Sequence, residues 1–207
     1  VFMGDHYLEN FVQAIFDGIG GVAGKTLIVG GDGRFYNDTA TETIVRMAAG
    51  NGAAKVIAGQ NGLLSTPAAS HLIRSMKTDG GIILSASHNP GGIDEDFGIK
   101  FNMSNGGPAP ESVTDAIFDV TKSITAYQSL DGGMVDLTTL GTRNLGDMLV
   151  EIVDPVSAYV DLMQSLFDFP AIKKMIAKGT QIRFDAMNAI TGPYASAIIE
   201  DLLGAEK

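Results

Sequence analysis

The stretch GGIILSASHNPGGIDEDFGIKFN, residues 80–102, decides the fold class. GIILSAS at 81–87 begins with an apolar run that predicts a buried strand, and FGIKFN at 97–102 predicts a second strand. Between them lies a loop rich in Pro and Gly that holds Ser87 and His88. A core strand that ends in small polar residues therefore presents a serine and a histidine at the rim of a sheet.

Helices and strands alternate on both sides of this stretch. Apolar residues at helical spacing predict helices over 7–17, 39–52, 65–77 and 110–124, and short apolar runs predict strands over 25–29 and 55–59. Asn37 or Asp38 is expected to cap the second helix, and Ser65 or Thr66 the third. This alternation predicts an α/β fold with a mixed, mostly parallel sheet and helices on both faces.

The alternation of helices and strands ends after residue 127. Repeated glycines separate short strand-like pieces over 128–150, and we interpret this segment as a connection. Beyond it, the patterns predict helices over 155–167, 170–178 and 192–203 and one strand over 180–186. A lone strand cannot form a sheet, so it either joins the first sheet or pairs with strands beyond Lys207. We favour the second alternative. It predicts a first domain over 1–150 and the beginning of a similar, truncated second domain over 151–207.

Composition and charge exclude several classes of protein. The 207 residues are 45% hydrophobic and 18% charged, which is typical of a globular protein. A net charge of -10 argues against a general nucleic-acid surface, and no apolar run is long enough for a membrane helix. Without cysteine the chain has no disulfide and no thiol chemistry. The first residues lack the basic and apolar blocks of a signal peptide, so we expect a cytoplasmic protein.

Three short motifs resemble ligand sites without meeting their requirements. GGVAGKT at 20–26 lacks the first Gly of a phosphate loop and leads into a strand, so a plain turn is expected. Asp32 in GGDGRF is more typical of a turn than of a metal site, and Arg34 is expected to support that turn or to lie near a substrate. The acidic residues 94–96 are interpreted as a solvated loop face.

The loop after residue 84 is the main candidate site. Ligands of open α/β sheets bind at the carboxyl ends of the strands, and glycine-rich backbone can cradle an anion. The residues therefore leave two alternatives, an anion-binding loop or a polar turn begun by Asn89 and Pro90. A Ser-His-Asp hydrolase fits poorly. No Gly-x-Ser-x-Gly elbow is present, and the His88 ring is expected to point away from Ser87 in an extended segment.

Several motifs together extend over nearly the whole chain. They are SASHNPGG, DFGIKFNMSNGGPAPE, GGDGRFYN, IVRMAAGNG and GQNGLLSTPA, followed by VEIVDPVSAYVDLM and IRFDAMNAITGPYA. These motifs resemble those of the phosphoglucomutases in the α-phosphohexomutase superfamily. The loop alone marks the superfamily, whereas DFGIKFN with SNGGPAP is typical of the glucomutases. The resemblance implies domain I and the start of domain II, hence the N-terminal portion of a longer protein.

The resemblance also implies a mechanism. Ser87 would carry a phosphoryl group and exchange it with glucose 1-phosphate or glucose 6-phosphate through glucose 1,6-bisphosphate. Lys100 would act as acid or base, His88 would contact the phosphate or the sugar or hold the loop, and Asn89 would bind substrate or brace the loop. Lys100 could instead be a strand lysine that faces solvent. Mg²⁺ would bind the phosphate on Ser87, with its Asp ligands beyond Lys207.

The chain also departs from the family pattern. Ser85 stands where Thr is usual, IDED at 93–96 replaces Pro-Asn-Gly-Asp, and the Ser-Gly-x-Arg segment, the Asp-rich metal loop, the sugar loop and the C-terminal domains are missing. The chain alone is therefore expected to be inactive and to require the missing domains. A non-catalytic structural or regulatory phosphoprotein of the same fold, or a mutase with another sugar preference, stays an alternative.

Overall fold

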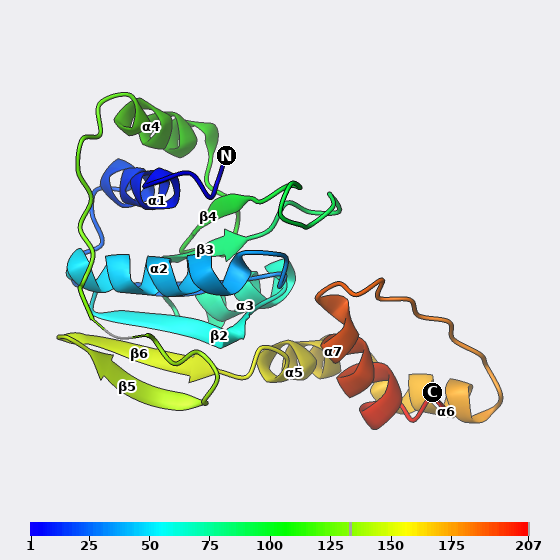
Figure 1. Cartoon of the computed structure of the whole chain (residues 1–207). Coiled ribbons are helices and arrows are strands. Elements are labelled where there is room, and N and C mark those ends of the chain that lie inside the picture. Colours follow the sequence, from blue (N-terminus) through cyan, green and yellow to red (C-terminus); the bar gives the residue numbers. More distant parts are fainter. Residues whose placement is uncertain (133, 207) are drawn as a thin grey trace.

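The structure is a computed structural model that describes residues 1–132 and 134–206 (Figure 1). The helices are α1 (Tyr7–Gly18), α2 (Asn37–Gly50), α3 (Thr66–Ser75), α4 (Glu111–Thr121), α5 (Ser157–Leu166), α6 (Phe169–Ala177) and α7 (Thr191–Ala195), followed by the π-helix η1 (Ser196–Leu202). The strands are β1 (Thr26–Gly31), β2 (Lys55–Leu63), β3 (Gly80–Leu84), β4 (Ile99–Met103), β5 (Gly141–Leu145) and β6 (Met148–Val153). Every helix and strand predicted before residue 128 is present, with ends shifted by a few residues.

The strands form one sheet in the order β4-β3-β1-β2-β6-β5. The four inner strands run parallel, and the edge strands β4 and β5 are antiparallel to their neighbours. In the register of β1 and β3, Gly31 at the end of β1 lies beside Leu84 at the end of β3. The predicted mixed, mostly parallel sheet is confirmed, and the segments that follow β1 and β3 emerge side by side.

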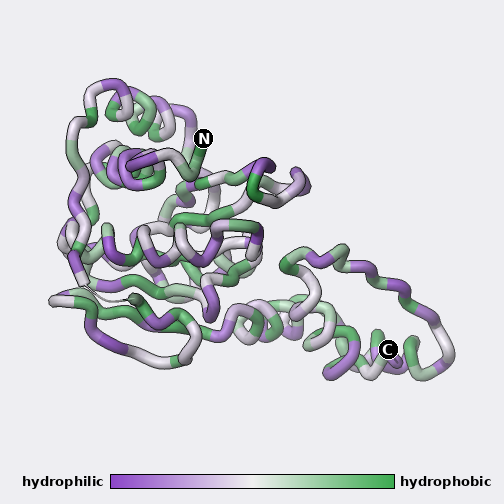
Figure 2. Tube along the Cα trace, in the orientation of Figure 1, coloured by the Kyte–Doolittle hydropathy of each residue, from purple (hydrophilic) through white to green (hydrophobic). Residues whose placement is uncertain are grey.

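Helices cover both faces of the sheet, as predicted. One apolar core contains buried residues of α1, α2 and α4, and a second contains those of α3 on the opposite face (Figure 1). Successive residues of a strand alternate between the two cores, so that Ile82 and Leu84 face the first while Ile83 faces the second. Where both faces are covered, as at β1 and β3, the strand is a nearly continuous run of apolar residues and glycine (Figure 2).

The helix caps were predicted with mixed success. Ser65 precedes α3, and its Oγ accepts a hydrogen bond from the backbone N–H of Ala68 at 3.3 Å, as expected. The predicted cap of α2 is wrong, because Asn37 is the first residue of the helix and is buried. Its amide donates to the carbonyl of Gly62, so this side chain ties α2 to β2.

Residues 128–150 are not merely a connection. They contain β5 and the first half of β6, an antiparallel pair in which β6 also adds parallel to β2. The burial of Met148, Val150 and Ile152 on one side of β6 shows the alternation expected of a strand that is covered on one face. β6 continues to Val153, beyond residue 150 where we divided the chain, so that division stays a prediction.

The predicted strand over 180–186 is wrong in this structure. Its backbone is assigned to no strand, and it pairs with none within the described residues. The segment links α6 to α7 at the end of the chain that projects away from the sheet (Figure 1). The predicted terminal helix is present as α7 and η1. In the described part of the chain, no helix is both long and apolar enough to cross a membrane.

Candidate functional site

The loop between β3 and β4 is anchored at its base. Ser85 is buried directly after β3, and its N–H donates to the carbonyl of Gly98 at 2.9 Å. From there the chain turns outward, and Ser87 and His88 are exposed at the carboxyl end of the parallel strands. Side chains at this edge of an α/β sheet are well placed to meet a ligand.

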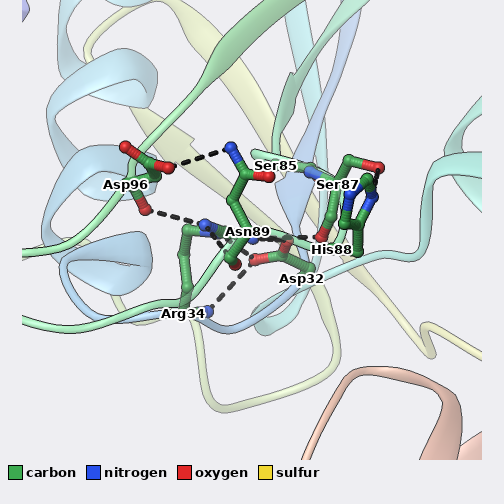
Figure 3. A network of polar contacts seen from close by, with 7 residues as sticks. All are labelled: Asp32, Arg34, Ser85, Ser87, His88, Asn89 and Asp96. Atoms are coloured by element: carbon green, nitrogen blue, oxygen red, sulfur yellow. Dashed lines mark hydrogen bonds and ion pairs between the residues drawn. The ribbon is translucent and has the colours of Figure 1, made fainter.

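Ser87 has an unusual backbone conformation. Its φ is 58°, which is left-handed, and its N–H donates to Ser85 Oγ at 3.1 Å. The segment is therefore not extended, and our expectation that the His88 ring points away from Ser87 is wrong. His88 Nδ1 lies 3.2 Å from Ser87 Oγ, and the hydroxyl can donate to this nitrogen when it carries no proton (Figure 3).

Asp32 and Arg34 lie beneath this loop. The Asp32 N–H donates to the carbonyl of Leu84 at 3.0 Å, because β1 and β3 end side by side. Arg34 Nη2 donates to Asp32 Oδ2 at 2.9 Å, and Arg34 Nη1 donates to the carbonyl of Asp96 at 2.7 Å (Figure 3). The sequence predicted support of the first turn, but missed this contact with the Ser87 loop. The parallel pairing of β1 and β3 was the signal that could have indicated it.

Asn89 braces the loop. Its Nδ2 donates to Asp96 Oδ2 at 2.9 Å, and its N–H donates to the carbonyl of Ala86 at 3.1 Å (Figure 3). Asp96 N–H in turn donates to the carbonyl of Pro90. These contacts agree with the bracing alternative for Asn89, and its predicted contact with substrate stays a prediction.

Lys100 is exposed on the edge strand β4 and pairs with Ile83 of β3. Ile99 and Phe101 pack in the core on the opposite face of the strand, as the alternation predicted. Lys100 lies two residues after Gly98, whose carbonyl holds Ser85, so its strand leads away from the base of the Ser87 loop. Within the described residues, the Lys100 side chain has no hydrogen bond or ion pair, and its predicted role stays a prediction.

The structure also places the glycine-rich turn before β1 and the two acidic motifs. Gly20 and Gly24 both have positive φ in the turn that leads into β1, where no helix follows to complete a phosphate loop. Asp32 is engaged by Arg34, and one Asp96 oxygen accepts from Asn89. Residues 1–132 and 134–206 contain no cluster of three His, Asp or Glu side chains that could hold a metal ion.

Comparison with known proteins places these features in a family. The model of the phosphoglucomutase/phosphomannomutase alpha/beta/alpha domain I matches residues 1–128. The phosphoglucomutase of Rhizobium radiobacter is 52% identical over 207 residues, and that of Schizosaccharomyces pombe is also 52% identical. The chloroplastic phosphoglucomutase of Arabidopsis thaliana is 46% identical. The alignments cover 100%, 99% and 100% of this chain but 38%, 37% and 34% of those proteins.

Solved structures agree with the sequence relatives. The open form of the exocytosis-sensitive phosphoprotein pp63/parafusin, a phosphoglucomutase from Paramecium, is 42% identical and superimposes with a TM-score of 0.94. It is matched over 100% of this chain and 40% of its own. A putative phosphomannomutase from Thermus thermophilus is 26% identical over 80% of this chain and 33% of its own, with a TM-score of 0.60.

The fold and the site define an α/β domain that presents a serine on an anchored loop at the carboxyl edge of its sheet. The chain belongs to the phosphoglucomutase/phosphomannomutase family. It spans less than two fifths of the length of the curated relatives described above, which agrees with the prediction that it is a portion of a longer protein.

Proposed function

We propose that the protein containing this chain is a phosphoglucomutase, which interconverts glucose 1-phosphate and glucose 6-phosphate with Ser87 as the phosphoryl carrier. The observation that supports this most strongly is the exposed position of Ser87, whose Oγ lies 3.2 Å from His88 Nδ1. The backbone of Ser87 is left-handed. The names of the relatives point to the same activity. A serine is a weak nucleophile on its own, so a neighbouring proton acceptor is a functional requirement.

The reaction exchanges one phosphorus–oxygen bond for another. When phosphorylated Ser87 meets a hexose monophosphate, the bond between phosphorus and Ser87 Oγ breaks and a bond to the free sugar hydroxyl forms. The sugar hydroxyl loses its proton, and Ser87 Oγ gains one. Glucose 1,6-bisphosphate then turns over in the site and returns its other phosphoryl group to Ser87. Such a transfer depends mainly on in-line positioning and on neutralising charge.

Two residues are candidates for the proton transfers. His88 Nδ1 is within hydrogen-bond distance of Ser87 Oγ, so it can hold the proton that this oxygen gains or loses. Lys100 is exposed on the neighbouring strand and is proposed as the acid or base for the sugar hydroxyl. Asn89 is proposed to contact substrate in addition to bracing the loop.

Mg²⁺ is the proposed cofactor, because a cation bound to a phosphoserine oxygen neutralises charge during transfer. The described part of this chain fits such a site only in part. Ser87 would supply one ligand through its phosphate, whereas the nearby Asp32 and Asp96 carboxylates are engaged by Arg34 and Asn89. We therefore expect the remaining Asp ligands, the sugar-binding loop and the other domains to lie outside this chain.

Replacement of Ser87 tests the proposal. In the full-length gene product, Ser87→Ala is expected to lower mutase turnover by at least about a thousandfold, since the covalent step loses its nucleophile. The matched control is Ser104→Ala, because Ser104 is also exposed and follows β4 rather than β3. A coupled assay of glucose 6-phosphate formation measures both. Wild-type turnover in Ser87→Ala would contradict the assignment.

Turnover assays with glucose and mannose phosphates, together with phosphopeptide analysis, separate the alternatives. The Paramecium relative is described as a phosphoprotein as well as a phosphoglucomutase, which supports keeping a non-catalytic phosphoprotein as a second candidate. A full-length protein that accepts phosphate on Ser87 but turns over neither glucose nor mannose phosphates would favour it. Turnover of mannose 1-phosphate alone would instead change the sugar assignment. The cytoplasmic location stays a prediction, because the relatives include chloroplastic proteins.

A further inference from the structure

A nearly buried guanidinium lies under the Ser87 loop. The Arg34 side chain is 7% exposed and the Asp32 side chain 15%. Arg34 Nε donates to Asp32 Oδ1 at 3.0 Å while Nη2 donates to Oδ2 at 2.9 Å, which is a two-pronged ion pair. Because the carboxylate balances the charge, the other N–H groups of the guanidinium are available for uncharged partners.

Those N–H groups contact the two ends of the loop. Arg34 Nη1 donates to the carbonyl of Asp96 at 2.7 Å, close to where the chain enters β4. Arg34 Nη2 donates to the carbonyl of Ser87 at 3.3 Å, close to where the chain leaves β3. Figure 3 shows dashed lines from Arg34 toward Asp32 and Asp96, and a dashed line that joins the Ser87 hydroxyl to His88. One side chain therefore holds both ends of the loop by their backbone.

These contacts bear on the strained conformation of Ser87. A left-handed backbone is unfavourable for serine and persists only where its surroundings fix it. Ser87 is fixed on both sides, because its N–H donates to Ser85 Oγ and its carbonyl accepts from Arg34. The orientation of the Ser87 side chain depends on this backbone conformation.

We propose that Asp32 and Arg34 are positioning residues for phosphoryl transfer, in which Asp32 orients the guanidinium and the guanidinium fixes the backbone of Ser87. This inference rests on the proposed mutase function. Phosphoryl transfer needs an in-line arrangement of oxygen, phosphorus and oxygen, and a misplacement of about 1 Å can cost about a hundredfold in rate. A lysine at position 34 would keep the charge but lose the planar fork that reaches two carbonyls and a carboxylate together.

The test compares two conservative arginine replacements in the full-length gene product. Arg34→Lys is expected to lower kcat about a hundredfold with KM changed by less than about threefold, since substrate binding is retained while alignment is lost. Amide hydrogen exchange in peptides covering 86–97 is expected to increase. Asp32→Asn keeps the shape of the side chain but removes its charge. It is also expected to lower kcat and to increase amide exchange, with a smaller loss of kcat than Arg34→Lys.

Arg46→Lys is the matched control. Arg46 also contacts a carboxylate, that of Glu42 at 3.8 Å, and a backbone carbonyl, that of Leu130 at 3.2 Å, but it lies on α2 away from the loop. Its replacement should leave kcat and exchange over 86–97 unchanged. Arg34→Lys and Asp32→Asn with wild-type kcat and wild-type exchange would overturn the inference. If the wild-type protein shows no mutase turnover, the proposed function fails, and the exchange comparison alone still decides whether Arg34 holds the loop.

Discussion

The sheet and the C-terminal helices contain similar apolar sequences but bury them very differently. Every residue of β3 is buried, whereas α5, α6 and η1 contain no buried residue. Apolar stretches are present in both regions (Figure 2). The difference shows that apolar periodicity indicates which residues can form a core, while burial depends on what lies opposite them.

The segment 180–186 illustrates this most clearly. Ile182 and Phe184 alternate with polar neighbours as in a strand, yet they are 43% and 52% exposed. β6 alternates in burial along its length and has β2 as a parallel partner, whereas 180–186 pairs with no strand within the described residues.

The two regions meet at Tyr194, which is buried. Its hydroxyl donates to the carbonyl of Pro155 at 2.7 Å and accepts from the N–H of Ser65 at 3.1 Å. The ring of Tyr159 packs against it edge to face. Tyr194 therefore joins α7, the start of α5 and the cap of α3.

The largest expected effect is a difference in the free energy of unfolding between a substitution in the sheet and one in the segment 180–186. Ile28 is fully buried in the central strand, so Ile28→Ala should lower the free energy of unfolding by about 2–5 kcal/mol. Ile182→Ala removes the same atoms from an exposed site and should change it by less than about 0.5 kcal/mol. Denaturant unfolding of this chain measures both. Equal losses would show that 180–186 is packed in solution and would remove the contrast between the regions.

A smaller loss of stability is expected from a substitution at Tyr194, where the sheet and the C-terminal helices meet. Tyr194→Phe keeps the ring but leaves the N–H of Ser65 and the carbonyl of Pro155 without a partner, at a cost of about 1–3 kcal/mol. Tyr159→Phe is the control, because no hydrogen bond of its hydroxyl is present among the described residues. Thermal unfolding of the two variants measures the difference. A Tyr194→Phe variant as stable as Tyr159→Phe would contradict the proposed junction.

The smallest expected effect is a pH dependence of the stability that Tyr194 contributes at the same junction. Burial raises the pKa of Tyr194 above its ordinary value. The unfolded chain therefore ionises this hydroxyl at lower pH than the folded chain, so its contribution to stability is complete below about pH 10 and is lost as the pH rises through the folded pKa. The difference in unfolding free energy between the wild type and Tyr194→Phe should shrink above about pH 10. A difference in unfolding free energy that stays constant up to pH 12 would contradict this prediction.

The sequence allowed the architecture of the first sheet to be predicted, because β1, β2 and β4 are each followed by a helix with clear apolar spacing. It did not reveal β5 and β6, whose pairing depends on β2, a strand distant in sequence. The same cause explains the incorrect strand at 180–186. A strand is specified by its partners, and periodicity alone does not identify them.

The site was predicted in its composition but not in its geometry. The order of Ser85, Ser87 and His88 indicated the loop, and its position after β3 is confirmed. The left-handed turn at Ser87 could not be predicted, since serine rarely adopts it and nothing local requires it. Arg34 reaches the loop only because β1 and β3 are neighbours in the sheet.

The central claim is that Ser87 is the phosphoryl carrier, and one measurement tests it most directly. The full-length gene product is incubated with glucose 1,6-bisphosphate, and its peptides are sequenced by tandem mass spectrometry. We expect one phosphoryl group, located on Ser87 and transferred away when glucose 1-phosphate is added. A phosphoryl group on another residue, or an unmodified Ser87 in a protein that turns over hexose phosphates, would contradict the account.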